Sequence, residues 1–126
     1  MSEILVPIGP ADLIDRLTRL QLRLNQLTDG CHLIERQIKR LQQAADHAFP
    51  PGAQLRNLWS ELAEVNADLL ALDEDLMRCE ERGEFGASFV ALARARIAAQ
   101  DNRAQIKQQI DTLIAATLPT NLGVGH

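Results

Sequence analysis

The stretch Leu55–Cys79, LRNLWSELAEVNADLLALDEDLMRC, decides the fold of this chain. Apolar residues recur in it at alternating intervals of three and four: Leu55, Leu58, Leu62, Val65, Leu69, Leu72, Leu76 and Cys79. This 3.5-residue period is held over three heptads and is typical of a helix that packs along a partner, as in a coiled coil. Arg82 and then Gly83 follow, a cation and a glycine suited to the end of a helix, so we predict a helix over residues 53–82.

Three further helices are expected from apolar spacing and from residues that start or stop helices. Gly9-Pro10-Ala11-Asp12 is typical of a first helical turn and predicts a helix over about 10–28. Pro50-Pro51-Gly52 ends a second helix over 30–49, and Pro119 follows a fourth over 87–116. The prediction is an all-α fold, an antiparallel helical bundle built on a long coiled-coil-like hairpin, as one domain over residues 1–117. Residues 3–8 are expected to form a short extended arm, and residues 118–126 a flexible tail.

The first two helices are each about two-thirds as long as the other two, which leaves two arrangements open. They stack end to end along the long hairpin, or part of the hairpin's apolar seam lacks a partner within the chain. In the second case a further copy of the chain would bury that seam. We therefore expect a homodimer or a higher homo-oligomer, with a partner protein as the other possibility.

Composition excludes several classes of function. The 126 residues carry 13 Lys and Arg against 17 Asp and Glu, a formal charge of −4, which suits neither general nucleic-acid binding nor anionic lipid. Aromatic residues are only 3%, too few for a base-stacking platform. No signal peptide or membrane span is apparent, and the two cysteines form no framework of pairs, so a cytoplasmic protein without membrane insertion is expected.

We expect no metal, cofactor or catalytic motif. Histidine and carboxylate residues lie close together in the pairs His32 and Glu35, and Asp46 and His47, but neither pair has zinc or di-iron spacing. The glycines fall at helix ends rather than in a phosphate-binding loop.

Polar residues on the long hairpin are the candidate site. With a bend at residues 83–86, facing residues have numbers that sum to about 169, which places Asp73 near Arg96, Asn66 near Arg103 and Asp75 near Arg94. Lys107 then lies near Glu61 or Leu62. Arg96 and Arg103 occupy seam positions where apolar residues are expected. The candidate ligand-binding residues are Asn66, Asp73, Arg96, Asp101, Arg103 and Lys107.

These charges have two interpretations. Polar layers in a helical seam set register and orientation, and this is the interpretation we favour. Alternatively, Arg96 and Arg103 present forked donors to a phosphate or carboxylate between the helices. That second role needs the arginines to outnumber nearby acids, and the expected register neutralises them.

Several segments resemble a short bacterial all-helical family of unknown function. They are Glu3-Ile-Leu-Val-Pro-Ile8, Leu13-Ile-Asp-Arg-Leu-Thr18, Glu64-Val-Asn-Ala-Asp-Leu69, Asp73-Glu-Asp75, Phe85-Gly-Ala-Ser-Phe-Val-Ala-Leu-Ala-Arg94 and Asp101-Asn-Arg-Ala-Gln-Ile-Lys107. Genes of that family lie near those for surface polysaccharide and sugar transfer, so the resemblance implies a bacterial protein in that context. The chain departs from the family pattern at Arg19, an aliphatic position, and at Leu70 and Ile97, where aromatic residues are common.

Three functions remain in view. The first is a non-catalytic helical module for self-association or protein interaction, accessory to surface-glycan assembly. The second is a small all-α enzyme or ligand-binding protein whose Arg/Asp/Asn pocket holds a phosphate- or carboxylate-bearing metabolite, by fold-level analogy with helical chorismate mutases. An export chaperone is the third. The lack of a catalytic motif favours a protein that is not an enzyme.

Overall fold

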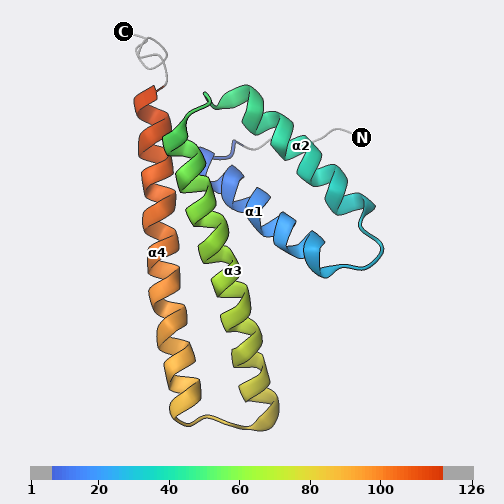
Figure 1. Cartoon of the computed structure of the whole chain (residues 1–126), viewed down its shortest axis with the longest axis vertical. Coiled ribbons are helices and arrows are strands. Elements are labelled where there is room, and N and C mark those ends of the chain that lie inside the picture. The colour runs from blue at the N-terminus through green and yellow to red at the C-terminus, as the bar shows by residue number, and fades with distance from the viewer. Residues whose placement is uncertain (1–6, 118–126) are drawn as a thin grey trace.

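The computed structural model describes residues 7–117, which contain four α-helices and no strand (Figure 1). They are α1 (Pro10–Gln26), α2 (His32–Ala48), α3 (Ala53–Arg82) and α4 (Ala87–Thr117). The predicted all-α class is confirmed, and α3 and α4 begin and end within one residue of the expected positions. α1 and α2 are shorter than expected because Leu27 is already extended and the following loop holds Gly30 in the left-handed region, at a φ of 69°.

The two predicted terminal segments lie largely outside the described part of the chain. Of the expected arm at residues 3–8, only Pro7 and Ile8 are described, and both are exposed and outside any helix. The expected tail at 118–126 lies wholly outside the described residues. Among residues 7–117, no helix combines the length and the apolar character needed to cross a membrane.

α3 and α4 form the predicted antiparallel hairpin along the long axis of the molecule (Figure 1). Gly83 ends α3 at a φ of 66°, and the backbone N–H of Glu84 donates to the carbonyl oxygen of Cys79 at 2.8 Å, as in a Schellman cap. The central seam positions are buried on both helices: Leu62, Val65, Leu69, Ile106 and Ile110. The heptad pattern therefore describes this hairpin correctly.

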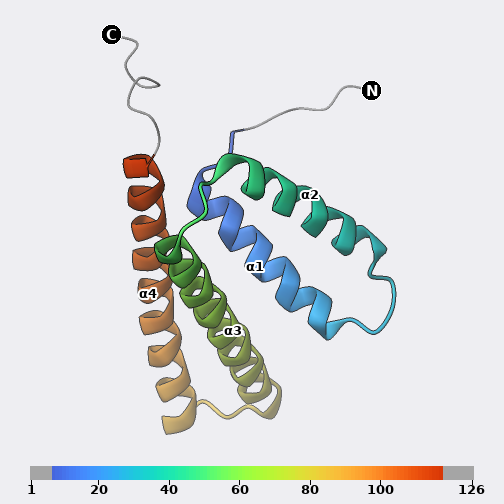
Figure 2. The same cartoon turned by 45° about the horizontal axis from the view of Figure 1, so that its top comes forward.

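α1 and α2 fold back on each other as a shorter antiparallel hairpin and do not stack end to end (Figure 2). α1 packs on both α3 and α4, whereas α2 packs on α1 alone. α2 and α3 are consecutive in the chain but do not pack along each other. The physical reason is that α2 already buries its apolar stripe against Leu13 and Leu17 of α1. That stripe consists of Ala45 with the flanking Ile38 and Leu41.

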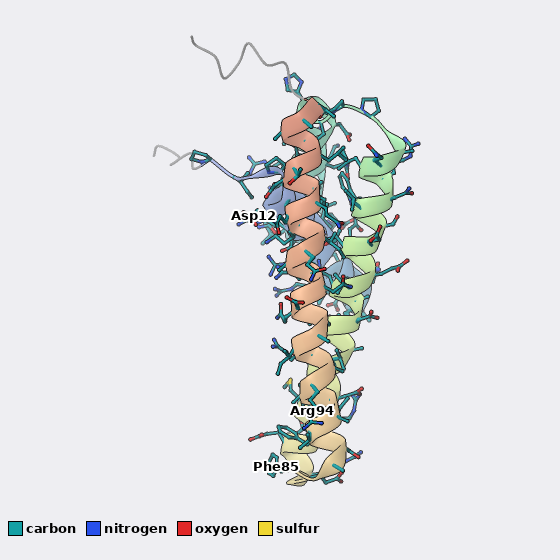
Figure 3. All side chains as sticks on the ribbon, turned by 90° about the vertical axis from the view of Figure 1, so that its left-hand side faces the viewer. Asp12, Phe85 and Arg94 are labelled. Atoms are coloured by element: carbon teal, nitrogen blue, oxygen red, sulfur yellow. The ribbon has the colours of Figure 1, made fainter. Side chains whose placement is uncertain are left out.

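The core lies at the end of the long hairpin where α1 crosses it. One cluster joins Ile14 of α1 to Leu62 of α3 and Ile110 of α4, and all three side chains are fully buried. Trp59 packs against this cluster and against the α1–α2 cluster, so its ring links the first two helices to the long hairpin. The opposite end of the hairpin, residues 70–100, is here called the distal half. The end of α1 reaches only its near edge, where the Gln26 side chain donates to Glu74 at 3.4 Å, and beyond that point α3 and α4 run without a third helix (Figure 3).

We predict that the two ends of the seam differ in stability. Leu62→Ala removes a fully buried side chain at the three-helix core and should cost about 3–5 kcal/mol of unfolding free energy. Leu76 occupies an equivalent heptad position in the distal half, where its side chain is only half-buried. Leu76→Ala should therefore cost about half as much unfolding free energy. Urea unfolding followed by circular dichroism measures both, and equal losses would contradict this description of the core.

Candidate functional site

A polar junction is buried where α1 crosses α3 and α4. Asp15 of α1 is only 1% exposed, and Asn66 of α3 and Thr18 of α1 are also buried. Burial of a carboxylate is costly unless hydrogen bonds and opposite charges replace its lost water. The contacts around Asp15 supply both.

Both carboxylate oxygens of Asp15 have partners. Its Oδ1 accepts the Asn66 side-chain amide at 2.9 Å and Arg103 Nε at 3.1 Å. Its Oδ2 accepts Arg103 Nη2 at 2.5 Å and lies 3.2 Å from Nε of Arg19. The Asn66 amide also donates to the Thr18 hydroxyl at 2.8 Å, and that hydroxyl donates to the Asp15 carbonyl oxygen. Among the described residues, no buried side-chain polar atom lacks a partner.

Two further contacts continue this junction along α4 as an antiparallel ladder. Lys107 Nζ lies 2.7 Å from an oxygen of Asp12, and Asp111 accepts the backbone N–H of Ala11 at 3.0 Å. The first turn of α1 has no side-chain N-cap of its own, so Asp111 satisfies an otherwise unpaired donor and places a negative charge at the positive end of the helix. We call these three rungs, from Asp15–Arg103 to Ala11–Asp111, the α1–α4 ladder.

The electrostatics of Asp15 favour its charged form. Burial by itself raises the pKa of the carboxyl group. The hydrogen bonds from Arg103 and Asn66 and the charges of Arg103 and Arg19 outweigh burial, so the pKa lies below its ordinary value. A carboxylate with a lowered pKa and both oxygens occupied is a poor proton acceptor. The contacts of Asp15 therefore hold the three helices together and do not suit proton transfer.

The structure brings four of the six candidate residues to one place. Asn66, Asp73, Arg96 and Arg103 line a cleft of ≈ 530 Å³ between α1 and the long hairpin, here called the wedge cleft. Arg19 and Arg23 of α1 line it as well, so arginines outnumber acids there. However, Arg103 and Arg19 bind Asp15, and Arg96 Nε lies 2.5 Å from Asp73. A ligand role for these residues stays a prediction, because carboxylates of the chain already neutralise Arg19, Arg96 and Arg103.

The remaining candidates lie elsewhere. Asp73 and Arg96 pair as expected, and Asn66 and Arg103 lie close together as expected, both bound to Oδ1 of Asp15. Lys107 binds Asp12 of α1, and its expected position near Glu61 or Leu62 stays a prediction. Asp101 lies on the exposed surface of α4, where its carboxylate accepts a hydrogen bond from the side-chain amide of Gln105. Asp75 binds Arg78 of its own helix, a local contact that supplies its opposite charge without Arg94.

Sequence reasoning missed Asp15, the residue at the centre of the junction. A signal existed, because α1 carries a second apolar stripe, Ala11, Ile14 and Leu22, beside its leucine heptad. Asp15 lies within one turn of Ala11 and Ile14, at the edge of this second stripe, so helices that pack on the stripe also cover the carboxylate. The partner of such a buried carboxylate could have been sought among Arg96 and Arg103.

No group of three or more His, Cys, Asp or Glu side chains among residues 7–117 is placed to hold a metal ion. Comparisons with protein-family models, with curated proteins and with solved structures find no match for this chain. The resemblance to the short bacterial family therefore stays a prediction.

The two seam arginines, equivalent in the sequence, should differ in their contribution to stability. Arg103→Ala leaves Asp15 buried without its forked partner and should cost about 3 kcal/mol. Arg96→Ala breaks a half-exposed pair with Asp73 and should cost about 0–1 kcal/mol. Chemical denaturation of the two variants gives the comparison, and a larger loss for Arg96→Ala would overturn this assignment.

Acid should remove the contribution of Asp15. Because folding lowers its pKa, the stabilisation is fully present above the ordinary value of 3.8 and is lost as the pH falls through the folded value. The stability difference between the wild type and Asp15→Asn should therefore be constant near neutral pH and shrink below about pH 4. Thermal unfolding over that pH range measures it, and a difference that grows in acid would show that the folded pKa is raised instead.

Proposed function

We propose that this protein is a non-catalytic helical module that self-associates through the distal half of its long hairpin. The supporting observation is a group of four large apolar side chains left exposed there. Ile97 is 70% exposed and Met77 62%, and Phe85 and Val90 are also exposed. These are four of the seven exposed large hydrophobic residues in the described chain, and an exposed apolar cluster of this kind is typical of an interaction surface.

Helical spacing aligns two of these side chains along α4, because Val90 precedes Ile97 by one heptad. Ala104, one heptad beyond Ile97, is itself exposed and lines a groove with Asp12 of α1, so this side of α4 runs beside α1 and not beneath it. On α3, Met77 follows Leu70, a residue of the wedge cleft, by one heptad. No other described helix covers these three exposed side chains.

A second copy of the chain suits this surface. Two hairpins that pack their distal halves face to face about a twofold axis would cover both exposed sets at once and complete a four-helix layer. Burial of Met77, Val90 and Ile97 contributes at most about 1.5–3 kcal/mol for each side chain. Phe85 packs edge to face on Phe89, with ring centroids 5.3 Å apart, and so offers a rigid apolar end to the same surface.

The biological setting of this module rests on the family resemblance alone. On that basis we propose an accessory, non-enzymatic role in bacterial surface-glycan assembly. A partner protein could then use the same distal surface.

Light scattering coupled to size exclusion tests the self-association. The wild type should elute at twice its chain mass of 14.0 kDa at micromolar concentration. Val90→Lys with Ile97→Lys should convert it to a monomer, because two charges on the proposed interface cannot be buried unpaired. The matched control is Ala91→Lys with Ala98→Lys, which adds the same charges at exposed positions one residue further along α4.

The two variants must retain the helical circular dichroism of the parent for the comparison to hold. A wild type that remains monomeric at high micromolar concentration would refute the proposal. Equal dissociation of both double variants would place the interface elsewhere on α4.

A further inference from the structure

A second groove runs between α1 and α2, next to the wedge cleft. It has a volume of ≈ 500 Å³. Four of its lining residues are arginines, namely Arg16, Arg19 and Arg23 of α1 and Arg40 of α2. Gln37, Leu20 and Leu41 complete its lining. We call this the arginine groove.

The arginine groove is cationic without local compensation. No acidic residue lines it. Arg19 is bound to Asp15, but Arg16, Arg23 and Arg40 form no ion pair with any residue between 7 and 117. These side chains are exposed, so their donors are accessible from solvent. By contrast, another groove between the same two helices carries Glu35 as well as Lys39, so the unbalanced charge belongs to one side of the helix pair.

The spacing of the arginines suits a ligand with several anionic groups. Arg16, Arg19 and Arg23 follow one edge of α1 at intervals of three and four residues, and the first and last are about 10 Å apart along the helix axis. Arg40 approaches from α2 across the groove. A guanidinium group donates two parallel hydrogen bonds, which match the oxygens of a phosphate. A single carboxylate would engage only part of this set.

We propose that the arginine groove binds a small molecule that carries two or more phosphate groups. Arg16, Arg23 and Arg40 donate to the phosphates, and Leu20 and Leu41 contact an uncharged part of the ligand. This site goes beyond the proposed function, because it lies on the α1–α2 hairpin and uses no residue of the distal half.

The charge of the long hairpin limits the size of the ligand. Residues 10–48 hold six Lys and Arg against five Asp and Glu, whereas residues 53–117 hold seven against eleven. The long hairpin therefore repels a polyanion that extends past the groove. A compact polyphosphate avoids that repulsion, while a nucleic acid does not.

Isothermal titration with inorganic tripolyphosphate at low ionic strength tests the site. The wild type should bind with one-to-one stoichiometry and more tightly than it binds orthophosphate. The triple variant Arg16→Gln, Arg23→Gln and Arg40→Gln should lose at least about tenfold in affinity, because it lacks three charged donors. The matched control, Arg56→Gln, Arg82→Gln and Arg94→Gln, removes the same charge from exposed arginines outside the groove and should bind within about twofold of the wild type.

The other outcomes would overturn the site. No binding by the wild type, or equal loss in both triple variants, would show that the groove has no specific role. If the groove variant binds tripolyphosphate normally but no longer self-associates, the groove is an interface for a second copy instead. If the triple variant loses its helical circular dichroism, the single variant Arg40→Gln takes its place in the titration. Arg40→Gln should weaken tripolyphosphate binding several-fold without loss of helix.

Discussion

One buried carboxylate on α1 determines how the two halves of this molecule fit together. Asp15 carries a charge, yet it has almost no exposed surface and lies among apolar residues at the point where α1 crosses the long hairpin. Asn66 reaches it from α3 and Arg103 from α4, so a single side chain joins three helices. Apolar contacts between helices tolerate small shifts, but a forked guanidinium–carboxylate pair tolerates very few. The junction therefore fixes one position and one orientation of α1.

The docking of α1 also explains why the molecule has one tightly packed end and one open end. One apolar stripe of α1 packs on the hairpin and the other on α2, so α2 does not lie along α3 or α4. A conventional four-helix bundle would use α2 to cover the long hairpin, and here it does not. The apolar face of the distal half, and the grooves that border α1, both result from this arrangement.

Much of the long hairpin could be predicted from the sequence, because its evidence is local. The heptads from Leu55 to Cys79 and the glycine at position 83 determine one helix and its end, and a known bend then places Asp73 opposite Arg96. The junction depends instead on a contact between Asp15 and Arg103, 88 residues apart, which no local spacing reports. For the same reason, helix lengths could not decide whether α2 folds back on α1.

The candidate site shows the same division. Arg96 and Arg103 occupy equivalent heptad positions, and the sequence gives no reason to separate them. Only the docked α1 gives Arg103 a buried carboxylate as its partner and leaves Arg96 half-exposed at the cleft. The arginine groove could not be predicted from the sequence, because the clustering of Arg16, Arg19 and Arg23 with Arg40 requires the α1–α2 hairpin to form.

The coupling energy between Asp15 and Arg103 tests the central claim most directly. A double-mutant cycle with Asp15→Asn, Arg103→Gln and the double variant isolates this pair from the other contacts of each residue. A coupling of about 2–3 kcal/mol in the stabilising direction is predicted for a buried, forked ion pair. A coupling below about 0.5 kcal/mol would mean that apolar contacts alone dock α1 on the hairpin, contrary to this account.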